Sequence, residues 1–402
     1  MSYYKELLEN PLLAYKNQYI CAKCVQQSDL QKFVQNSSNE LAYCSLCNKR
    51  QKVMPLDDFL VHVKDCITEF YDDKEGGYMG GSTFDTYDLI HDELLGDESP
   101  QLQEIVQNAL GSDTIWGDIY ADDNAAMPLW TSWDKFKEIT IKQYRYTFLA
   151  LQMHSQPINF STTSHSSPKD TLLILHDLIR EYNLFTKIPP GTIFYRARLL
   201  DTGKDYPSVR ELCPPPEESA SAGRMNPAGI SLFYCSADLD TCLYEKDTPT
   251  AQQNRVVAHF KNLRELTVLD LTNLPSIPSI FADNSSERPI LKFLHGFAQE
   301  ISEPVPQEDK QNLQYIPTQI LTEYFRYFMT DPHGNKLDGI CYQSAKNPSG
   351  KNYALFFNRT DFKDMESSDS VQMSPNSMFE LVDIDMNPQC SHERFFAGFK
   401  LT

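Results

Sequence analysis

The residues best suited to chemistry lie in one turn and in two short motifs that follow it. The stretch 223–236 reads Gly-Arg-Met-Asn-Pro-Ala-Gly-Ile-Ser-Leu-Phe-Tyr-Cys-Ser, which predicts a turn containing Arg224 and Asn226 before a strand. The planar guanidinium of an arginine in such a turn can bind a phosphate through two hydrogen bonds. Glu245 follows a short predicted helix, and Ser344 ends the motif Asp-Gly-Ile-Cys-Tyr-Gln-Ser about a hundred residues later. Together these groups suit a site that holds a phosphorylated substrate and stabilises a developing positive charge.

Each residue alone also fits an ordinary structural role. A single arginine in a loop is most often solvated, and a glutamate after a helix is usually a surface residue. Tyr195 and Tyr234 fit plain strand positions equally well, and Ser344 fits the cap of a turn. The functional interpretation therefore depends on the combination.

The combination resembles the RES family, named for an Arg, a Glu and a Ser, whose known members are mostly bacterial toxins that destroy NAD. The resemblance covers about residues 188–365. Its parts are Phe194-Tyr-Arg-Ala-Arg198, Arg224 with Asn226 and Gly229, then Tyr234, Glu245 and Ser344. RES domains are similar to ADP-ribosyltransferases, so the resemblance implies an α+β domain with a split β-sheet and NAD in its central cleft.

The resemblance also implies a role for each residue. Arg196 and Arg224 would bind phosphates, and the two tyrosines would offer flat faces and hydroxyls to the nicotinamide and its ribose. Glu245 would hydrogen bond a ribose hydroxyl and balance the positive charge, while Ser344 would orient the substrate or the glutamate. The implied catalytic residues are Arg224, Tyr234, Glu245 and Ser344. The implied cofactor-binding residues are Tyr195, Arg196, Arg224 and Asn226.

The acceptor of the ADP-ribosyl group decides the reaction. Cleavage of the nicotinamide–ribose bond passes through an oxocarbenium-like state, related to the one that glycosidases stabilise. Water as acceptor gives an NAD glycohydrolase, inorganic phosphate an NAD phosphorylase, and a protein or nucleotide group an ADP-ribosyltransferase. NAD depletion is the leading hypothesis. The alternatives are ADP-ribosyl transfer and a non-catalytic module that senses NAD or ADP-ribose. An antitoxin or regulatory protein is the expected protein partner.

Four cysteines near the N-terminus have the spacing of a zinc ribbon. Cys21 and Cys24 form one Cys-x-x-Cys pair, and Cys44 and Cys47 form another about twenty residues later. Two such turns can bring four thiolates to one tetrahedral zinc ion, with no position left for a reacting water. We therefore expect structural zinc; four buried or redox-active cysteines are the alternative.

Helical patterns follow the ribbon. The first spans Pro55 to Tyr71, with apolar residues at helical spacing, and contains His62, which is a further candidate ligand or an ordinary core or surface residue. An acidic, glycine-containing segment, 72–100, predicts a loop. Further helices are expected at 102–110, 133–151 and 167–182, the last opened by the capping sequence Ser-Pro-Lys-Asp.

This helical middle is similar to the HEPN-like segment that precedes RES domains. HEPN ribonucleases carry an Arg and a His a few residues apart on one helix, whereas Arg145 and His154 are spaced too widely. A structural or sensory role is therefore favoured over a nuclease.

Strand patterns begin after Pro189-Pro-Gly191. They are expected at 192–197, 229–236, 255–260, 266–271, 339–343, 353–358 and 378–384, with helices from Pro289 and from Pro317 to Met329. This mixture indicates an α+β fold. The predicted domains are a zinc ribbon with its first helix (1–71), a helical HEPN-like region (72–187) and an ADP-ribosyltransferase-like RES domain (188–402).

The composition excludes several classes of partner. The net charge of −19 and a pI near 4.9 argue against a broad surface for nucleic acid or anionic lipid, although a local basic groove stays open. No stretch approaches the roughly 20 apolar residues that a membrane-spanning helix needs, and the N-terminus lacks a secretory pattern. We expect a cytoplasmic protein whose ten cysteines are reduced or bind metal.

Overall fold

The computed structural model describes residues 11–73, 83–112, 114–118, 128–145, 167–201, 208–245, 253–303, 313–363, 377–386 and 388. Two compact units divide the chain. Unit 1 contains Met1–Thr131 and Ser276–Lys292, and unit 2 contains Ser132–Pro275 and Phe293–Thr402. The domain boundaries predicted at residues 71 and 187 stay predictions.

Unit 1 begins with a small sheet in the order β1 (Tyr19–Ile20), β3 (Arg50–Pro55), β2 (Glu40–Tyr43), with helix α2 (Ser28–Ser37). Helix α3 (Leu56–Phe70) follows as predicted. The apolar positions of its 3.6-residue pattern are all buried: Leu56, Phe59, Leu60, Val63, Ile67 and Phe70. His62 stacks on Phe33, with ring centroids 3.6 Å apart, so it has a packing role.

The second part of unit 1 combines helix α5 (Pro100–Leu110) with the strands β4 (Tyr71–Asp73), β6 (Ile115–Asp118) and β5 (Thr83–Asp85). These short strands lie in and after the segment that the sequence predicts as a loop. A distant segment completes the unit: Ile280 and Phe281 are buried in its core, and Gln27 donates to the Ser279 hydroxyl at 3.0 Å.

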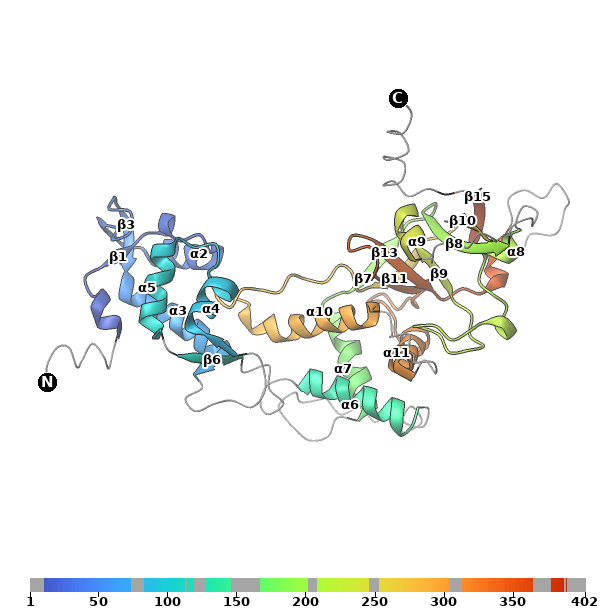
Figure 1. Ribbon diagram of the computed structural model, residues 1–402, viewed down its shortest axis with the longest axis horizontal. Coiled ribbons are helices and arrows are strands. Elements are labelled where there is room, and N and C mark those ends of the chain that lie inside the picture. The colour runs from blue at the N-terminus through green and yellow to red at the C-terminus, as the bar shows by residue number, and fades with distance from the viewer. Residues whose placement is uncertain are drawn as a thin grey trace, which may run out of the picture. The chain divides into compact units, whose positions relative to one another are not determined.

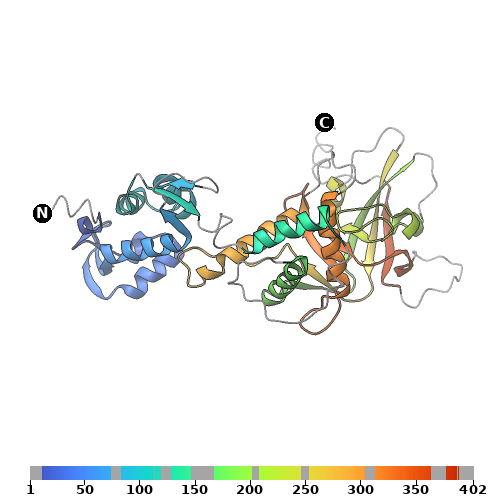
Figure 2. The same cartoon turned by 90° about the horizontal axis from the view of Figure 1, so that it is seen from below.

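Unit 2 contains the helices α6 (Pro128–Lys142), α7 (Pro168–Glu181), α10 (Arg288–Ser302) and α11 (Ile316–Tyr327). The first residues of α6 and of α10 are assigned to unit 1. The predicted cap of α7 is present, since Ser167 and Asp170 form a capping box. Trp133 packs edge-on against Phe297 and donates to Glu300 at 2.8 Å, and the Tyr324 hydroxyl lies 3.1 Å from the His176 ring. Figure 2 shows α6, α7 and α11 gathered at one side of the sheet.

A mixed sheet forms the centre of unit 2 (Figure 1). Among the described residues it has nine strands, in the order β14-β15-β10-β8-β9-β13-β12-β11-β7. In that order their bounds are Phe362–Lys363, Phe379–Asp385, Gln253–Asn262, Ile193–Asp201, Phe233–Ser236, Lys351–Leu355, Gly339–Gln343, Leu266–Asp270 and Phe185–Ile188. The pairs β14–β15 and β11–β12 are parallel. The α+β class is therefore confirmed.

Two strand predictions need correction. The strand expected at 229–236 forms only from Phe233, because Gly229 has a positive φ of 86° that belongs to a turn. The strand expected at 353–358 lies at Lys351–Leu355. That shift brings Asn352 into the sheet. Strands β7 and β14 were not predicted.

The sheet opens between β8 and β9. Strands β10 and β8 pair continuously from Gln253–Asp201 to Lys261–Ile193, whereas the pairing of β8 with β9 is confined to Tyr195 opposite Ser236. Beyond that pair the two backbones diverge. Helix α9 (Leu239–Glu245) packs beside both strands at this point (Figure 1). The opening agrees with the split sheet that the family resemblance implies.

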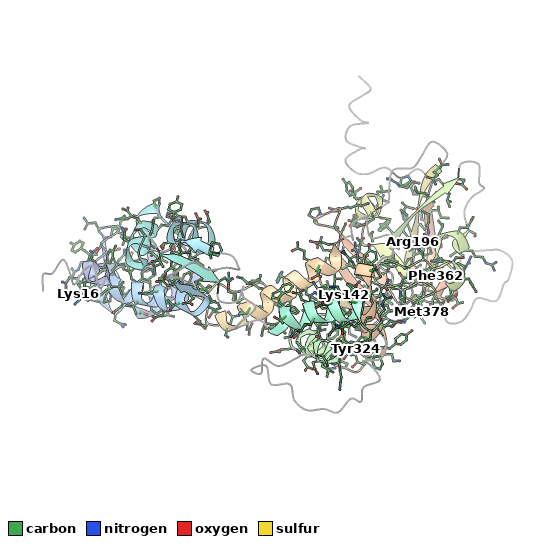
Figure 3. The ribbon with its side chains drawn as sticks, turned by 60° about the horizontal axis from the view of Figure 1, so that its bottom comes forward. Lys16, Lys142, Arg196, Tyr324, Phe362 and Met378 are labelled. Atoms are coloured by element: carbon green, nitrogen blue, oxygen red, sulfur yellow. The ribbon has the colours of Figure 1, made fainter. Side chains whose placement is uncertain are left out.

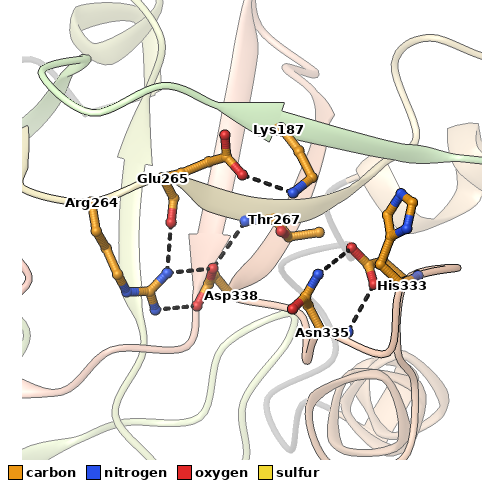
Figure 4. A network of polar contacts seen from close by, with 8 residues as sticks. Lys187, Arg264, Glu265, Thr267, His333, Asn335 and Asp338 are labelled. Atoms are coloured by element: carbon orange, nitrogen blue, oxygen red, sulfur yellow. Dashed lines mark hydrogen bonds and ion pairs between the residues drawn. The ribbon is translucent and has the colours of Figure 1, made fainter.

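The Asp-Gly start of β12 is anchored by a polar network (Figure 4). Arg264 donates two hydrogen bonds to the Asp338 carboxylate, at 2.9 and 2.5 Å, and the Thr267 amide donates a third at 2.9 Å. The next residue, Gly339, must lack a side chain, because an added Cβ would lie 2.7 Å from the Ala354 carbonyl oxygen. This network fixes the strand that leads to Tyr342 and Ser344.

None of the helices that the structure describes is long and apolar enough to cross a membrane.

Candidate active site

A cavity of about 300 Å³ lies where β8 and β9 diverge. Four predicted residues line it: Tyr195 and Arg196 from β8, Tyr234 from β9 and Glu245 from the end of α9. Two residues that were not predicted, Tyr342 of β12 and Asn352 of β13, complete much of the wall. The site is therefore assembled from four strands and one helix.

The Glu245 carboxylate is held by two donors. The Ser344 hydroxyl and the Asn352 amide both donate to Oε1, each at 2.6 Å. Asn352 is itself oriented by the Ser236 hydroxyl, which donates to its side-chain oxygen at 2.7 Å. Ser236, Ser344 and Asn352 are all buried. Because both bonds go to Oε1, the carboxylate is fixed while Oε2 has no hydrogen bond within the described part of the chain.

The loop after Ser344 is tied to the helix that carries Glu245. The amides of Lys346 and Asn347 donate to the Ser344 hydroxyl oxygen at 3.2 and 3.0 Å. Asn347 also donates to the Thr241 hydroxyl of α9 at 2.8 Å. Gly350 ends this loop. Its lack of a side chain is needed, because a Cβ there would lie 2.1 Å from the Thr241 hydroxyl. Ser344 and Glu245 are thus held together by backbone as well as side chains.

Asn226 and Tyr234 stabilise the turn that carries Arg224. The Asn226 amide donates to the carbonyls of Ser221, Pro227 and Ile230, while its oxygen accepts the Tyr234 hydroxyl at 2.8 Å. That hydroxyl also accepts the Met225 amide at 3.0 Å. Both polar groups therefore face the turn rather than an open cavity. Their contact with a ligand stays a prediction, and the ring of Tyr234 is what lines the cavity.

Gly223→Ala should destabilise this turn. An added Cβ would lie 2.6 Å from the Asn226 side-chain oxygen and 3.1 Å from the Tyr234 hydroxyl. We expect a loss of about 1–3 kcal/mol in urea unfolding, as for other overpacked sites. Ala228→Ser, an exposed change in the same turn, is the matched control and should stay within about 0.5 kcal/mol of the parent. Equal stability of the two variants would contradict this reading of the turn.

Arg224 lies over the ring of Tyr342, 5.5 Å from its centroid. Helix α11 fixes the backbone of the turn: the Thr318 hydroxyl donates to the Arg224 carbonyl at 2.6 Å, and Gln319 donates to the Gly223 carbonyl at 2.8 Å. The guanidinium of Arg224 therefore lies beside the cavity wall and forms no ion pair among the described residues.

Arg196, labelled in Figure 3, lies in unit 2. It is a buried charge without a carboxylate partner among the described residues. It donates to the Tyr234 carbonyl, across the gap between the two diverging strands, and its Nε has no hydrogen-bond partner within the described ranges. Burial, with the neighbouring Arg198, lowers the pKa of Arg196 to about 9. Burial also lowers the pKa of Arg198, whose Nε is likewise unpaired. An anionic ligand in the cavity would offset this uncompensated positive charge.

The residues missed by sequence analysis are Ser236, Tyr342 and Asn352. Tyr342 and Ser236 lie within predicted strands, and strand alternation gives no reason to choose them over their neighbours. Asn352 falls just before a predicted strand. Its role depends on pairing across the sheet, with Ser236 on one side and Tyr342 on the other.

The four N-terminal cysteines form a second candidate site, in unit 1. Their Sγ atoms all lie within 4.8 Å of one another, with 3.6 Å between Cys21 and Cys24 and 3.8 Å between Cys24 and Cys44. Four sulfurs about 2.3 Å from a tetrahedral zinc ion would be about 3.8 Å apart. Gln51 donates to the sulfurs of Cys21 and Cys47, as residues around metal ligands commonly do. The four cysteines can therefore hold a metal ion.

The fold and the cavity define an α+β domain with a fixed carboxylate and uncompensated arginines at an opened sheet. Comparison with protein families matches residues 193–375 to the RES domain and residues 37–154 to HEPN/RES N-terminal domain 1. The chain therefore contains a RES domain, preceded by the N-terminal region that the second match describes. A RES domain supports an NAD-related, toxin-type function in general. No match was found among curated proteins, and none among solved structures.

The N-terminal match begins inside the ribbon, before Cys44, and extends to the segment around His154. Arg145 is described, but His154 lies outside the described residues. The spacing argument against a HEPN nuclease pair therefore stays a prediction.

Proposed function

We propose that the cavity between β8 and β9 binds NAD and cleaves its nicotinamide–ribose bond. The observation that carries this proposal is the Glu245 carboxylate, fixed through Oε1 by Ser344 and Asn352 at a cavity that also contains unpaired arginine charge. A carboxylate at one side and cations at another match the two ends of the reacting half of NAD, the ribose and the diphosphate.

Each group then has a distinct task. Arg196, with Arg224 beside the cavity wall, binds the diphosphate, whose negative charge compensates the buried guanidinium. The ring of Tyr195 bounds the space for the nicotinamide or its ribose. Oε2 of Glu245 accepts a hydrogen bond from a ribose hydroxyl, and its charge stabilises the oxocarbenium-like state.

The bond changes are simple. The nicotinamide nitrogen leaves with the electron pair of the glycosidic bond, and the acceptor oxygen forms the new bond to the ribose carbon. With water as acceptor, the products are nicotinamide, ADP-ribose and a proton. With phosphate, the product is ADP-ribose-1″-phosphate.

Product analysis separates these reactions. Purified full-length protein would be incubated with NAD, with and without inorganic phosphate, and nicotinamide, ADP-ribose and ADP-ribose-1″-phosphate would be separated by chromatography. Nicotinamide release with either sugar product supports the proposal and names the acceptor. ADP-ribose found only on protein would instead establish a transferase. NAD binding without turnover would favour the alternative of a non-catalytic module that senses NAD.

We also propose that the chain acts as a toxin or defence effector in the cytoplasm, restrained by an antitoxin or another regulatory protein. Expression in a host should then arrest growth and lower cellular NAD, and Glu245→Ala should prevent both. Arrest with unchanged NAD would argue against this role.

The cysteine cluster is proposed to hold structural zinc. Metal analysis should find one zinc ion per chain, and Cys24→Ser should lose it together with the fold of the ribbon, because zinc binding supplies on the order of 10 kcal/mol to such lobes. Cys66→Ser is the control, since Cys66 is a half-buried free thiol outside the cluster. Zinc retained by Cys24→Ser, or absent from folded parent protein, would contradict the assignment.

A further inference from the structure

A row of side chains crosses the large sheet at the level of the cavity. Tyr195 lies opposite Ser236, Ser236 opposite Asn352, and Asn352 opposite Tyr342. Directly opposed residues of antiparallel strands present their side chains on the same face. These four residues line the cavity.

The same row continues in the other direction, away from the cavity. Tyr195 lies opposite His259 of β10, and His259 lies opposite Asp383 of β15. Neither residue has a part in the reaction proposed above. Both belong to the face that carries the cavity residues.

His259 contacts Tyr195 directly. The two rings meet edge to face, with centroids 4.8 Å apart and an interplanar angle of 64°. Tyr195 also packs against a small apolar cluster of Ala197, Val257 and the α9 residues Cys242 and Leu243. The tyrosine therefore contacts both this cluster, to which α9 contributes, and the imidazole of His259.

Packing alone does not account for a histidine at position 259. Its side chain is only 21% exposed, and its buried Nε2 has no hydrogen-bond partner in the part of the chain that the structure describes. Its Nδ1 lies 3.7 Å from the Asp383 carboxylate. An apolar side chain would fill the same space without leaving a buried nitrogen unsatisfied.

A β-bulge directs Asp383 towards this histidine. The pairing of β10 with β15 shifts between His259 and Phe260, where Leu381 rather than Val382 becomes the next partner. Bulges of this kind re-aim side chains and occur beside active sites. The irregularity falls directly after His259, whose ring contacts the ring of Tyr195.

We infer that His259 is a positioning residue which, oriented by Asp383, fixes the ring of Tyr195 at the cavity and so sets the affinity for NAD. This inference rests on the proposed function, because it assigns Tyr195 to the wall against which NAD binds. It adds two residues, from β10 and β15, that touch no substrate.

The test is a double-mutant cycle on full-length protein, read as KM and kcat for nicotinamide release. His259→Ala should raise KM about 3- to 10-fold, the value of a lost aromatic contact, and change kcat less than about twofold. In a Tyr195→Ala background the same change should have no further effect. His259→Phe keeps an aromatic edge and should restore KM. Asp383→Asn should raise KM less than His259→Ala, and not at all when residue 259 is Phe.

Lys261→Ala is the matched control. It lies two residues along β10, pairs with Glu380 of β15 at 2.8 Å, and should leave KM unchanged. An equal rise in KM in the parent and Tyr195→Ala backgrounds, or no rescue by Phe, would overturn the inference alone. Absence of nicotinamide release from folded parent protein would overturn the proposed function as well, so the two failures are distinguishable.

Discussion

Glu245→Gln is expected to lower kcat for nicotinamide release about 100- to 1000-fold and to leave KM within a few-fold of the parent value. The amide keeps the size of the side chain and can still accept hydrogen bonds from Ser344 and Asn352. It removes the negative charge that, in the proposed reaction, stabilises the oxocarbenium-like state, a contribution made mainly in the transition state. Steady-state kinetics on both proteins measure the effect.

Two further variants define what that result means. Glu265→Gln removes another carboxylate of unit 2, one that pairs with Lys187 at 2.7 Å, and should leave kcat unchanged. Asn352→Ala removes one of the two donors that fix Glu245, and we expect an intermediate loss of about tenfold. A Glu245→Gln enzyme with parental kcat would remove Glu245 from the chemistry.

Arg196→Met is expected to abolish stabilisation by NAD while affecting the free protein much less. In the parent, saturation at about 100 times Kd should raise the unfolding free energy by about 2.7 kcal/mol. The variant should lose most of this increase, because it lacks the buried charge that we propose binds the diphosphate. Without ligand, the variant lacks the hydrogen bond to the Tyr234 carbonyl, which lowers its unfolding free energy. It also lacks a buried, unpaired charge, which raises its unfolding free energy, so the two effects oppose each other.

Thermal or urea unfolding with and without NAD measures both quantities. Arg326→Met is a useful comparison, since Arg326 lies over the ring of Phe356 rather than at the cavity. That variant should keep the full NAD effect. If Arg196→Met were stabilised by NAD as strongly as the parent, the diphosphate would have to bind elsewhere.

Local patterns were predicted well where one physical rule acted alone. The periodicity of Leu56 to Phe70 identifies all six buried positions of α3, because a helix against a core needs apolar residues every three or four positions. The bounds of β12 match the prediction of 339–343. The four cysteines come together as their spacing predicts.

The candidate site was only partly predictable, because residue types do not reveal strand register. Glu245 and Ser344 were predicted from a family resemblance, and the structure brings them within 2.6 Å. Asn352 and His259 gain their positions through pairing with distant strands, so nothing local marks them. For the same reason, the sequence gives no sign that Ile280 and Phe281 complete the core of unit 1.

We propose that the cavity between β8 and β9 cleaves NAD through Glu245. The most direct measurement is the time course of nicotinamide release from NAD by full-length protein and by Glu245→Gln, side by side, with zinc content and unfolding midpoint matched. The account predicts steady release by the parent and a rate at least about 100-fold lower in the variant. Equal rates in both, or no release by folded parent protein, would contradict it.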